Sequence, residues 1–529
     1  MQRKKLDIWT PTLLALVMVG GMFIGYDLRG KAAGDSFFAS SRKSTIEEVM
    51  SVIESKYVDK VQYDSVSQAV IDEILGKLDP HSSFIPYNKL KEANEELMGN
   101  FQGIGIEFQI FDDTIHVLSV VPDGPSFTAG LEQGDKILKA NDTILLTKKK
   151  LNGDSIRGIF RGEAGTNIKV ALLRNGKILE KTITRGNIPV SAIDAAHMLN
   201  SKTGYIKINK FGDRTYEEFM QSLEKLQAQK MTQLVLDLRG NGGGLMGEAT
   251  AIADEFLSGD KLIVYTEGEK SGRFEYRCKK EGLFETGKLV VLIDETSASA
   301  SEVLSGALQD WDRATIIGRR SFGKGLVQQQ FNLSDGSALR LTIARYYTPL
   351  GRNIQKDYTH KSKKEYYDAF LEQYENGHLT QQDTIQPATK PFKTPSGRTV
   401  YGGGGITPDI FVPMDSTLLS KETARIYSKS TLNKFAYYYG MQHKNNWKNI
   451  NNATALLEEL NKDATIWNQF NAFATKDSAA INGISTAEKQ KMKEYLFALI
   501  ARHQFRSNGY YQILNNYDLT IRKALEFLQ

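Results

Sequence analysis

Residues 289–310, LVVLIDETSASASEVLSGALQD, join an apolar run to a helical pattern through a turn rich in serine and alanine. The apolar run predicts a buried strand, and the helix is expected to begin near Ser299 or Ser301. Serines at 297, 299 and 301 alternate with alanines, which would let a substrate backbone approach closely. Backbone N–H groups at a helix start lack helical partners and can bind a developing oxyanion. The junction therefore suits acyl transfer, although a helix cap supported by Glu302 is the simpler interpretation, and both can hold at once.

A glycine-rich turn ends another apolar run upstream, in residues 234–244, LVLDLRGNGGG. Glycine lets backbone amides approach a ligand closely, so this turn is a second candidate oxyanion donor. A flexible strand-to-helix connection is the ordinary alternative. Apolar strands alternate with helical segments from residue 190 to 415, which predicts an α/β core. Within this core, residues 356–393 are polar and partly helical, and we interpret them as an insertion.

Residues 318–328, GRRSFGKGLVQ, approach the spacing of a phosphate-binding loop. Such a loop needs Ser or Thr after its lysine and then a helix, whereas Lys324 precedes Gly325 and a pattern of two strands. A nucleotide site is therefore not expected. Burial lowers the pKa of a lysine, and a neutral amine paired with a serine can act as a general base. A surface lysine in a tight turn is the alternative.

The composition limits the class of protein further. The chain has 529 residues, a net charge of +5 and 41% hydrophobic residues, which is typical of several globular domains. Charges of both signs are mixed, so a nucleic-acid partner is not expected. Cys278 is the single cysteine, which leaves neither an intrachain disulfide nor a CxxC zinc site. The histidines form no recognised catalytic or metal motif, and His81 is interpreted as a turn or packing residue. We predict no metal and no cofactor.

The N-terminal residues 1–29 predict a membrane segment. Arg3, Lys4 and Lys5 precede an uncharged run from residue 8 to 26. Basic residues before an apolar run place the N-terminus inside and the rest of the chain outside the cytoplasm. No convincing small-residue cleavage site follows, which favours a retained anchor over a cleaved signal peptide. The body is thus expected in the cell envelope, in the periplasm if the source is a diderm bacterium.

Four regions follow the membrane segment and are defined by their periodicity. Residues 30–96 carry a helical pattern that LDPHSSF interrupts, and residues 97–189 form short alternating strands with glycine-rich turns. Residues 190–415 are the α/β core, and residues 416–529 are mostly helical. The sequence does not assign a role to residues 356–393 or 416–529.

Several blocks together resemble the C-terminal processing peptidases, or tail-specific proteases. They are SASASEVLSGALQDWDRATIIGRRSFGKGLVQ, LVLDLRGNGGGL, GSALRLTIARYYTPLGRNIQ, GITPDI and LDPHSSF. The blocks occur in the family's order over residues 44–412. The resemblance implies a serine endopeptidase with a Ser-Lys dyad and a multidomain α+β fold, in which an α/β protease core carries an inserted PDZ domain between helical N-terminal and C-terminal regions.

The same resemblance assigns roles to individual residues. It implies Ser299 as nucleophile, Lys324 as general base and Gln328 as the residue that orients the lysine. Alternation along a strand would put Lys324 and Gln328 on one face. It also implies the amides of Ala300 and Gly243 as oxyanion donors, with Gly244 as the alternative to Gly243. If Ser299 is not the nucleophile, Ser297 or Ser301 is next.

The β-rich region resembles a PDZ domain through FQGIGIEF and AGLEQGDKIL. Such domains add a C-terminal strand to a sheet edge and hold its carboxylate with backbone N–H groups. The matching positions are Gly103, Ile104, Gly105 and Ile106, whose apolar side chains favour protein substrates with apolar C-termini. A non-catalytic binding or scaffold protein is the rival interpretation, which the intact dyad opposes. Self-association or an adaptor site through the terminal helices stays open.

Overall fold

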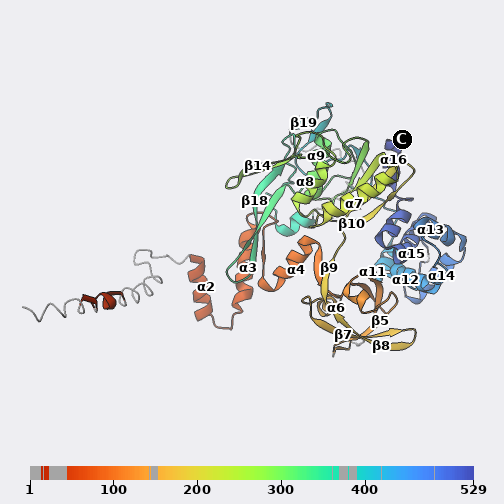
Figure 1. The fold of residues 1–529 in the computed structure, drawn as a ribbon, viewed down its shortest axis with the longest axis horizontal. Helices are drawn as coiled ribbons and strands as arrows, with labels where there is room; N and C mark the ends of the chain where they lie inside the picture. The colour runs from red at the N-terminus through yellow and green to blue at the C-terminus, as the bar shows by residue number, and fades with distance from the viewer. Residues whose placement is uncertain are drawn as a thin grey trace, which may run out of the picture. The chain divides into compact units, whose positions relative to one another are not determined.

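The computed structural model describes residues 14–15, 17–22, 45–141, 143–144, 153–359, 361–368, 379, 390–418, 420–481 and 483–529. The chain divides into two compact units, Met1–Ile74 and Leu75–Gln529. Helix α2 (Thr45–Lys56) lies in the first, and α3 (Tyr63–Gly76) ends just beyond it, which confirms the predicted helical pattern (Figure 1). No helix among the described residues is long and apolar enough to cross a membrane, and most of the predicted anchor lies outside them.

A six-stranded sheet is the centre of the second unit. Its order is β10-β11-β12-β15-β16-β21, and all neighbours are parallel except the edge pair β10 and β11. The α/β core predicted from sequence is therefore present. The strands are β10 (Ile193–Met198), β11 (Thr203–Ile208), β12 (Gln233–Asp237), β15 (Lys288–Ile293), β16 (Thr315–Gly318) and β21 (Ile410–Phe411).

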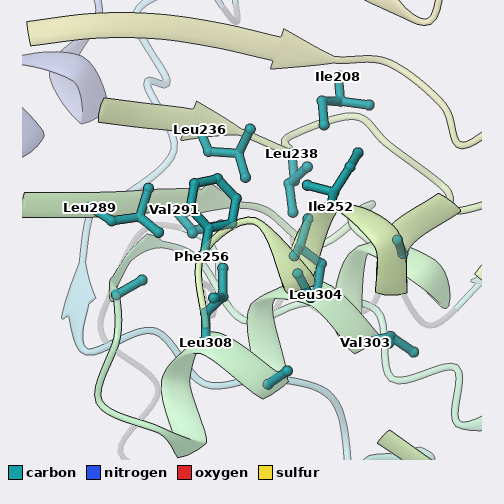
Figure 2. Packing of buried hydrophobic residues seen from close by; sticks show 14 of the residues in the cluster. Ile208, Leu236, Leu238, Ile252, Phe256, Leu289, Val291, Val303, Leu304 and Leu308 are labelled. Atoms are coloured by element: carbon teal, nitrogen blue, oxygen red, sulfur yellow. The ribbon is translucent and has the colours of Figure 1, made fainter. Parts of the chain in front are cut away.

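Helices cover both faces of this sheet. Alternate residues of each strand point to opposite faces. One face packs against α7 (Thr215–Ala228), α8 (Met246–Asp254) and α9 (Ala300–Asp310). Figure 2 shows this core, with Leu236, Leu289 and Val291 from the strands against Leu304 and Leu308 from α9. The other face packs against α16 (Leu519–Leu528).

A second sheet supplies the remaining strands of the core. Its order is β1-β18-β13-β14, with β17 paired to β18, so that β17 and β18 form the antiparallel hairpin expected from the sequence. The strands are β1 (Ser83–Ile85), β13 (Leu262–Gly268), β14 (Gly272–Arg277), β17 (Leu326–Asn332) and β18 (Ala338–Tyr347). Helix α4 (Tyr87–Met98) follows β1, and the hairpin β19 (Pro391–Lys393) and β20 (Thr399–Tyr401) follows β18.

The β-rich region is a twisted sheet of order β3-β4-β5-β7-β8, with β6 paired to β5. Its elements are β3 (Ile106–Phe111), β4 (Thr114–Val120), α5 (Pro125–Thr128), β5 (Lys136–Ala140), β6 (Thr143–Ile144), α6 (Gly153–Phe160), β7 (Asn167–Arg174) and β8 (Lys177–Thr184). The antiparallel pair β2 (Asn100–Gly103) and β9 (Gly186–Pro189) brings the two ends of this region together, as in an inserted domain.

The C-terminal region is helical, as predicted, and has its own apolar core. Its helices are α11 (Lys421–Ser428), α12 (Thr431–His443), α13 (Ala453–Lys462), α14 (Ile466–Lys476), α15 (Thr486–Leu514) and α16. Helix α15 breaks at Phe505 and Arg506, which have non-helical backbone angles. Helix α16 leaves this bundle and joins the core of the central sheet instead.

Candidate active site

A cavity of about 690 Å³ is lined by residues from the central sheet, its connecting turns and the second sheet. Most of the residues predicted for catalysis meet there. The lining includes His81, Gly243, Ser299, Ala300, Lys324 and Gln328.

Ser299 is set apart from its two neighbouring serines by its position. It caps α9, is partly exposed, lines the cavity and has a φ of 54°, which a non-glycine residue rarely adopts. Ser297 and Ser301 are fully buried instead. Their hydroxyls donate to the carbonyl oxygens of Leu238 and Asn241, each at 2.9 Å. Of the three serines, Ser299 alone lines the cavity, and strained backbone of this kind often marks a functional site.

The carboxylate of Glu302 joins the turn before α9, which contains Ser299 (the serine turn), to the turn before β17, which contains Lys324 (the lysine turn). Its Oε2 accepts the backbone N–H groups of Ser299 and Lys324, at 2.8 and 2.9 Å. Its Oε1 accepts the N–H of Gly323 at 2.7 Å and the hydroxyl of Ser321 at 2.5 Å. Complete burial raises the pKa of Glu302 to about 7, against these four hydrogen bonds, which favour the carboxylate. The helix cap expected from the sequence thus also fixes the two turns relative to each other.

Lys324 lies in the turn before β17 and lines the cavity. Burial is the largest influence on its pKa and lowers it below the ordinary 10.5, while the carboxylates of Glu302 and Asp79 act in the opposite direction. The hydroxyl of Tyr346 lies 2.6 Å from the carbonyl oxygen of Lys324 and 3.2 Å from that of Ser299. This backbone clamp adds to the one made by Glu302.

Gln328 lines the same cavity, but its amide nitrogen donates to Thr342 Oγ1 at 3.2 Å. Both side chains reach one cavity, as predicted, but regular strand alternation does not account for it. Lys324 precedes the first residue of β17, and the register of β17 shifts between Val327 and Gln328, so a simple period of two does not relate Lys324 to Gln328.

The glycine turn approaches the serine turn closely. The N–H of Gly243 donates to Asn241 Oδ1 at 2.9 Å, so the amide predicted as an oxyanion donor already has a partner. Gly244 pairs with Phe211 in an isolated parallel β-bridge. In this bridge the N–H of Phe211 donates to the carbonyl oxygen of Gly243, and the N–H of Leu245 donates to the carbonyl oxygen of Phe211. Because peptide groups alternate along a strand, the N–H of Gly244 points away from Phe211. Gly244 also lines the cavity.

His81 was interpreted as a turn or packing residue, yet it lines the cavity beside Lys324. Its ring nitrogens lie 3.1 and 3.2 Å from the hydroxyls of Tyr367 and Tyr366. Burial, followed by the charge of Lys324, lowers the pKa of His81 to about 3, so the ring is neutral at ordinary pH. Pairing of β1 with β18 brings this segment to the site. The tyrosines come from the segment interpreted as an insertion, so that segment contributes to the surroundings of the cavity.

A second cavity, of about 480 Å³, lies between the edge strand β3 and helix α6. Ile104, Gly105 and Ile106 line it, as expected for a groove that receives a peptide strand. Gly103 lies instead in the β2–β9 ladder, where it pairs with Gly186. The groove walls also include Phe101, Phe108 and Phe160, together with Arg157 and Arg161.

Family models match three regions of the chain. Residues 202–361 match peptidase family S41, and residues 102–184 match the PDZ domain. Residues 423–506 match a family of unknown function. The α/β core with its serine and the inserted domain therefore define a serine-type peptidase that carries a PDZ domain.

Relatives make the assignment more specific. A carboxy-terminal-processing protease of Bartonella bacilliformis is 34% identical over 356 residues, which cover 64% of this chain and 80% of the relative. A probable CtpA-like serine protease of Staphylococcus aureus is 32% identical, over 66% of this chain and 69% of the relative. The chain belongs to the carboxy-terminal-processing proteases. A solved photosystem II D1 C-terminal processing protease is also similar, with 24% identity, a TM-score of 0.35, and coverage of 70% of this chain and 92% of that one.

Proposed function

We propose that the chain is a serine endopeptidase in which Ser299 and Lys324 form the catalytic dyad. The observation that carries this proposal is the cavity that both residues line. The two neighbouring serines use their hydroxyls on backbone carbonyls, which leaves Ser299 as the candidate nucleophile. A lysine can accept a proton only when it is neutral, and burial lowers the pKa of Lys324 in the direction this requires.

In the proposed reaction, Ser299 Oγ attacks the scissile carbonyl carbon while its proton passes to Lys324 Nζ. The tetrahedral intermediate collapses, the C–N bond breaks, and the lysine returns the proton to the departing amine. Neutral Lys324 then takes a proton from water as the water oxygen attacks the ester carbon. The second tetrahedral intermediate collapses, the C–O bond to Ser299 breaks and the acid is released, while Lys324 returns the proton to Ser299 Oγ. Gln328 has a supporting place in the cavity wall, next to Thr342.

The oxyanion would be bound by two backbone N–H groups. Ala300 is the first residue of α9, so its N–H lacks a helical partner and benefits from the positive end of the helix. Gly244 supports the second donor better than Gly243, because the N–H of Gly243 is held by Asn241. Binding through Gly243 would require that hydrogen bond to break.

Substrate tails are proposed to bind in the groove between β3 and α6. An added strand would pair with β3, and the backbone around Gly105 and Ile106 would receive the terminal carboxylate. The apolar walls favour apolar terminal residues. We also propose that cleavage takes place outside the cytoplasm with the chain anchored in the membrane, on the charge pattern of residues 1–29.

The dyad is tested with the full-length chain and an unfolded protein that ends in apolar residues, with products identified by mass spectrometry. The wild type and the surface control Lys177→Ala should cleave, whereas Ser299→Ala and Lys324→Ala should be silent. Cleavage by Ser299→Ala would exclude Ser299 as nucleophile. A silent wild type that still binds the tail would favour a non-catalytic binding or scaffold protein. Fusion of residues 1–60 to alkaline phosphatase, which needs an oxidising compartment, tests the location.

A further inference from the structure

The carboxylate of Asp518, in the C-terminal region, makes two kinds of contact. Its Oδ1 caps α16 by accepting the N–H groups of Thr520 and Ile521, at 2.8 and 3.0 Å. Its Oδ2 accepts a hydrogen bond from Arg239 Nη1 at 2.9 Å. The helix is held on the sheet by Ile521, Ala524 and Leu528. One side chain therefore connects the start of α16 to a residue of the protease core.

Arg239 stands between the end of β12 and the glycine turn. Its guanidinium binds both carboxylate oxygens of the fully buried Asp237, at 3.0 and 2.7 Å. Its carbonyl oxygen accepts a hydrogen bond from Lys207 Nζ at 2.6 Å, and this ammonium lies 3.7 Å from Asp237. Two acidic and two basic groups thus form a neutral cluster, and Asp518 supplies one of its two negative charges. Without that charge the cluster would keep an uncompensated cation in a poorly solvated place.

The residue after Arg239 begins the path to the catalytic groups. The N–H of Gly240 lies 3.1 Å from each carboxylate oxygen of Asp294, which also accepts the N–H of Ser297 at 3.1 Å. Asn241 then accepts the N–H of Ala298 through its carbonyl oxygen at 3.0 Å. The glycine turn and the serine turn are therefore bonded to each other directly after Arg239.

Asp294 is a further acidic group in the same cavity as the Arg239 guanidinium. Arg239, Asp294 and Asp518 line one polar cavity of about 330 Å³, together with Arg319. If Asp518 lost its charge, Asp194, Asp237 and Asp294 would be the acidic groups left in that cavity, and of these Asp294 binds the N–H groups of Gly240 and Ser297. Attraction of Asp294 toward Arg239 would weaken its bond to Gly240 and so displace the glycine turn.

We propose that Asp518 is a positioning residue for the catalytic site: through Arg239 it holds the glycine turn in register with the serine turn. This rests on the proposed function of Ser299 and of the turn amides. It also gives the C-terminal region a role in catalysis that does not depend on substrate binding, because Asp518 lies outside both the catalytic cavity and the tail-binding groove.

The test uses the full-length chain with Asp518→Asn, Asp518→Ala and Asn452→Ala. Asparagine caps helices about as well as aspartate, so Asp518→Asn removes the charge and keeps the cap. Asn452→Ala is the matched control, since Asn452 caps α13 by accepting the N–H of Ala455 at 2.9 Å on an exposed surface. We expect Asp518→Asn to lower kcat about ten- to a hundredfold, as displaced catalytic groups do, with KM changed less than about twofold. Asn452→Ala should leave kcat unchanged.

Hydrogen exchange of residues 240–244, at a temperature well below unfolding, gives a readout that does not need activity. Asp518→Asn should speed exchange there, and Asn452→Ala should not. The proposal is overturned if Asp518→Asn changes neither kcat nor the exchange rate and only Asp518→Ala is destabilised. Asp518 would then act as a helix cap alone. If the wild type is silent, the proposed function fails, and the exchange result still decides whether Asp518 holds the turn.

Discussion

A β-carbon placed on Gly243 would lie 2.9 Å from the Cβ of Ser299, closer than folded proteins allow. The glycine turn and the serine turn therefore meet without room for a methyl group. The φ of Gly243 is 100°, which also disfavours any other residue. The contact explains a glycine at this position independently of any role of its amide as a donor.

Gly243→Ala should thus reduce kcat/KM by about a hundredfold or more, because a displacement of catalytic groups by about 1 Å has that effect. Gly247→Ala is the control, since Gly247 lies in α8 and nothing stands within 4 Å of the added methyl group. That control should fold at least as well as the wild type. Activity of Gly243→Ala near the wild-type level would show that the two turns are not held as described.

Glu302→Gln should inactivate the enzyme and destabilise it by about 3 kcal/mol. An amide has one acceptor oxygen, so at least two of the four donors around Glu302 would face an NH2 group. Chemical denaturation and the cleavage assay measure the two effects. Glu285→Gln serves as the control, because its carboxylate accepts the N–H of Gly282 through one oxygen, which glutamine retains. Equal stability of both variants would contradict the clamp.

The value of kcat/KM should rise with pH and then level off. The apparent pKa of this rise should lie below the 10.5 of an ordinary lysine. In the proposed reaction Lys324 reacts in its neutral form, and burial lowers its pKa, so the active fraction grows as pH increases. Protonation of Glu302, whose pKa is about 7, acts in the same direction on the acidic side by weakening the clamp. Lys324→Arg should be inactive throughout, because its guanidinium keeps its charge. Activity that falls with rising pH over this range would exclude lysine as the base.

Ile106→Asp should raise KM for a substrate with an apolar C-terminus about tenfold or more, with kcat nearly unchanged. Ile106 lines the groove on the edge strand β3, and an acidic group there would repel a terminal carboxylate. Ile178→Asp is the matched control, since Ile178 is 67% exposed on β8 at the opposite edge of the same sheet. Binding of a fluorescent tail peptide checks affinity separately from cleavage, and equal weakening by both variants would place the site elsewhere.

The regular elements of the core could be predicted because their patterns are local. Residues 289–310 show a buried strand, a polar turn and a helix in order, and the structure has β15, the turn and α9 in the same places. The serine cap with Glu302 three residues later was readable for the same reason. The resemblance to a family assigned roles to Ser299, Lys324 and Gln328, and the structure has all three in the lining of one cavity.

The remaining contacts depend on where distant segments meet. His81 reaches the cavity because β1 pairs with β18, a pairing that local periodicity does not encode. The bond from Gly243 to Asn241 depends on side-chain orientation within a turn, and the shift at Gln328 depends on a bulge. Asp518 lies 279 residues from Arg239 in the sequence, so no local pattern signals their contact.

The packing of α16 on the central sheet also determines when the protease core can be completed during synthesis. Lys288 Nζ donates to the carbonyl oxygen of Leu528 across 240 residues of sequence, and Val290 and Leu292 share the apolar cluster with Leu528. Until residues 519–528 have been synthesised, α16 cannot cover that face of the sheet and exclude water from it, and contacts of such long range form late. A nascent chain would therefore carry its serine and lysine for much of its synthesis before the scaffold beneath them is complete, which would protect the growing polypeptide from its own activity.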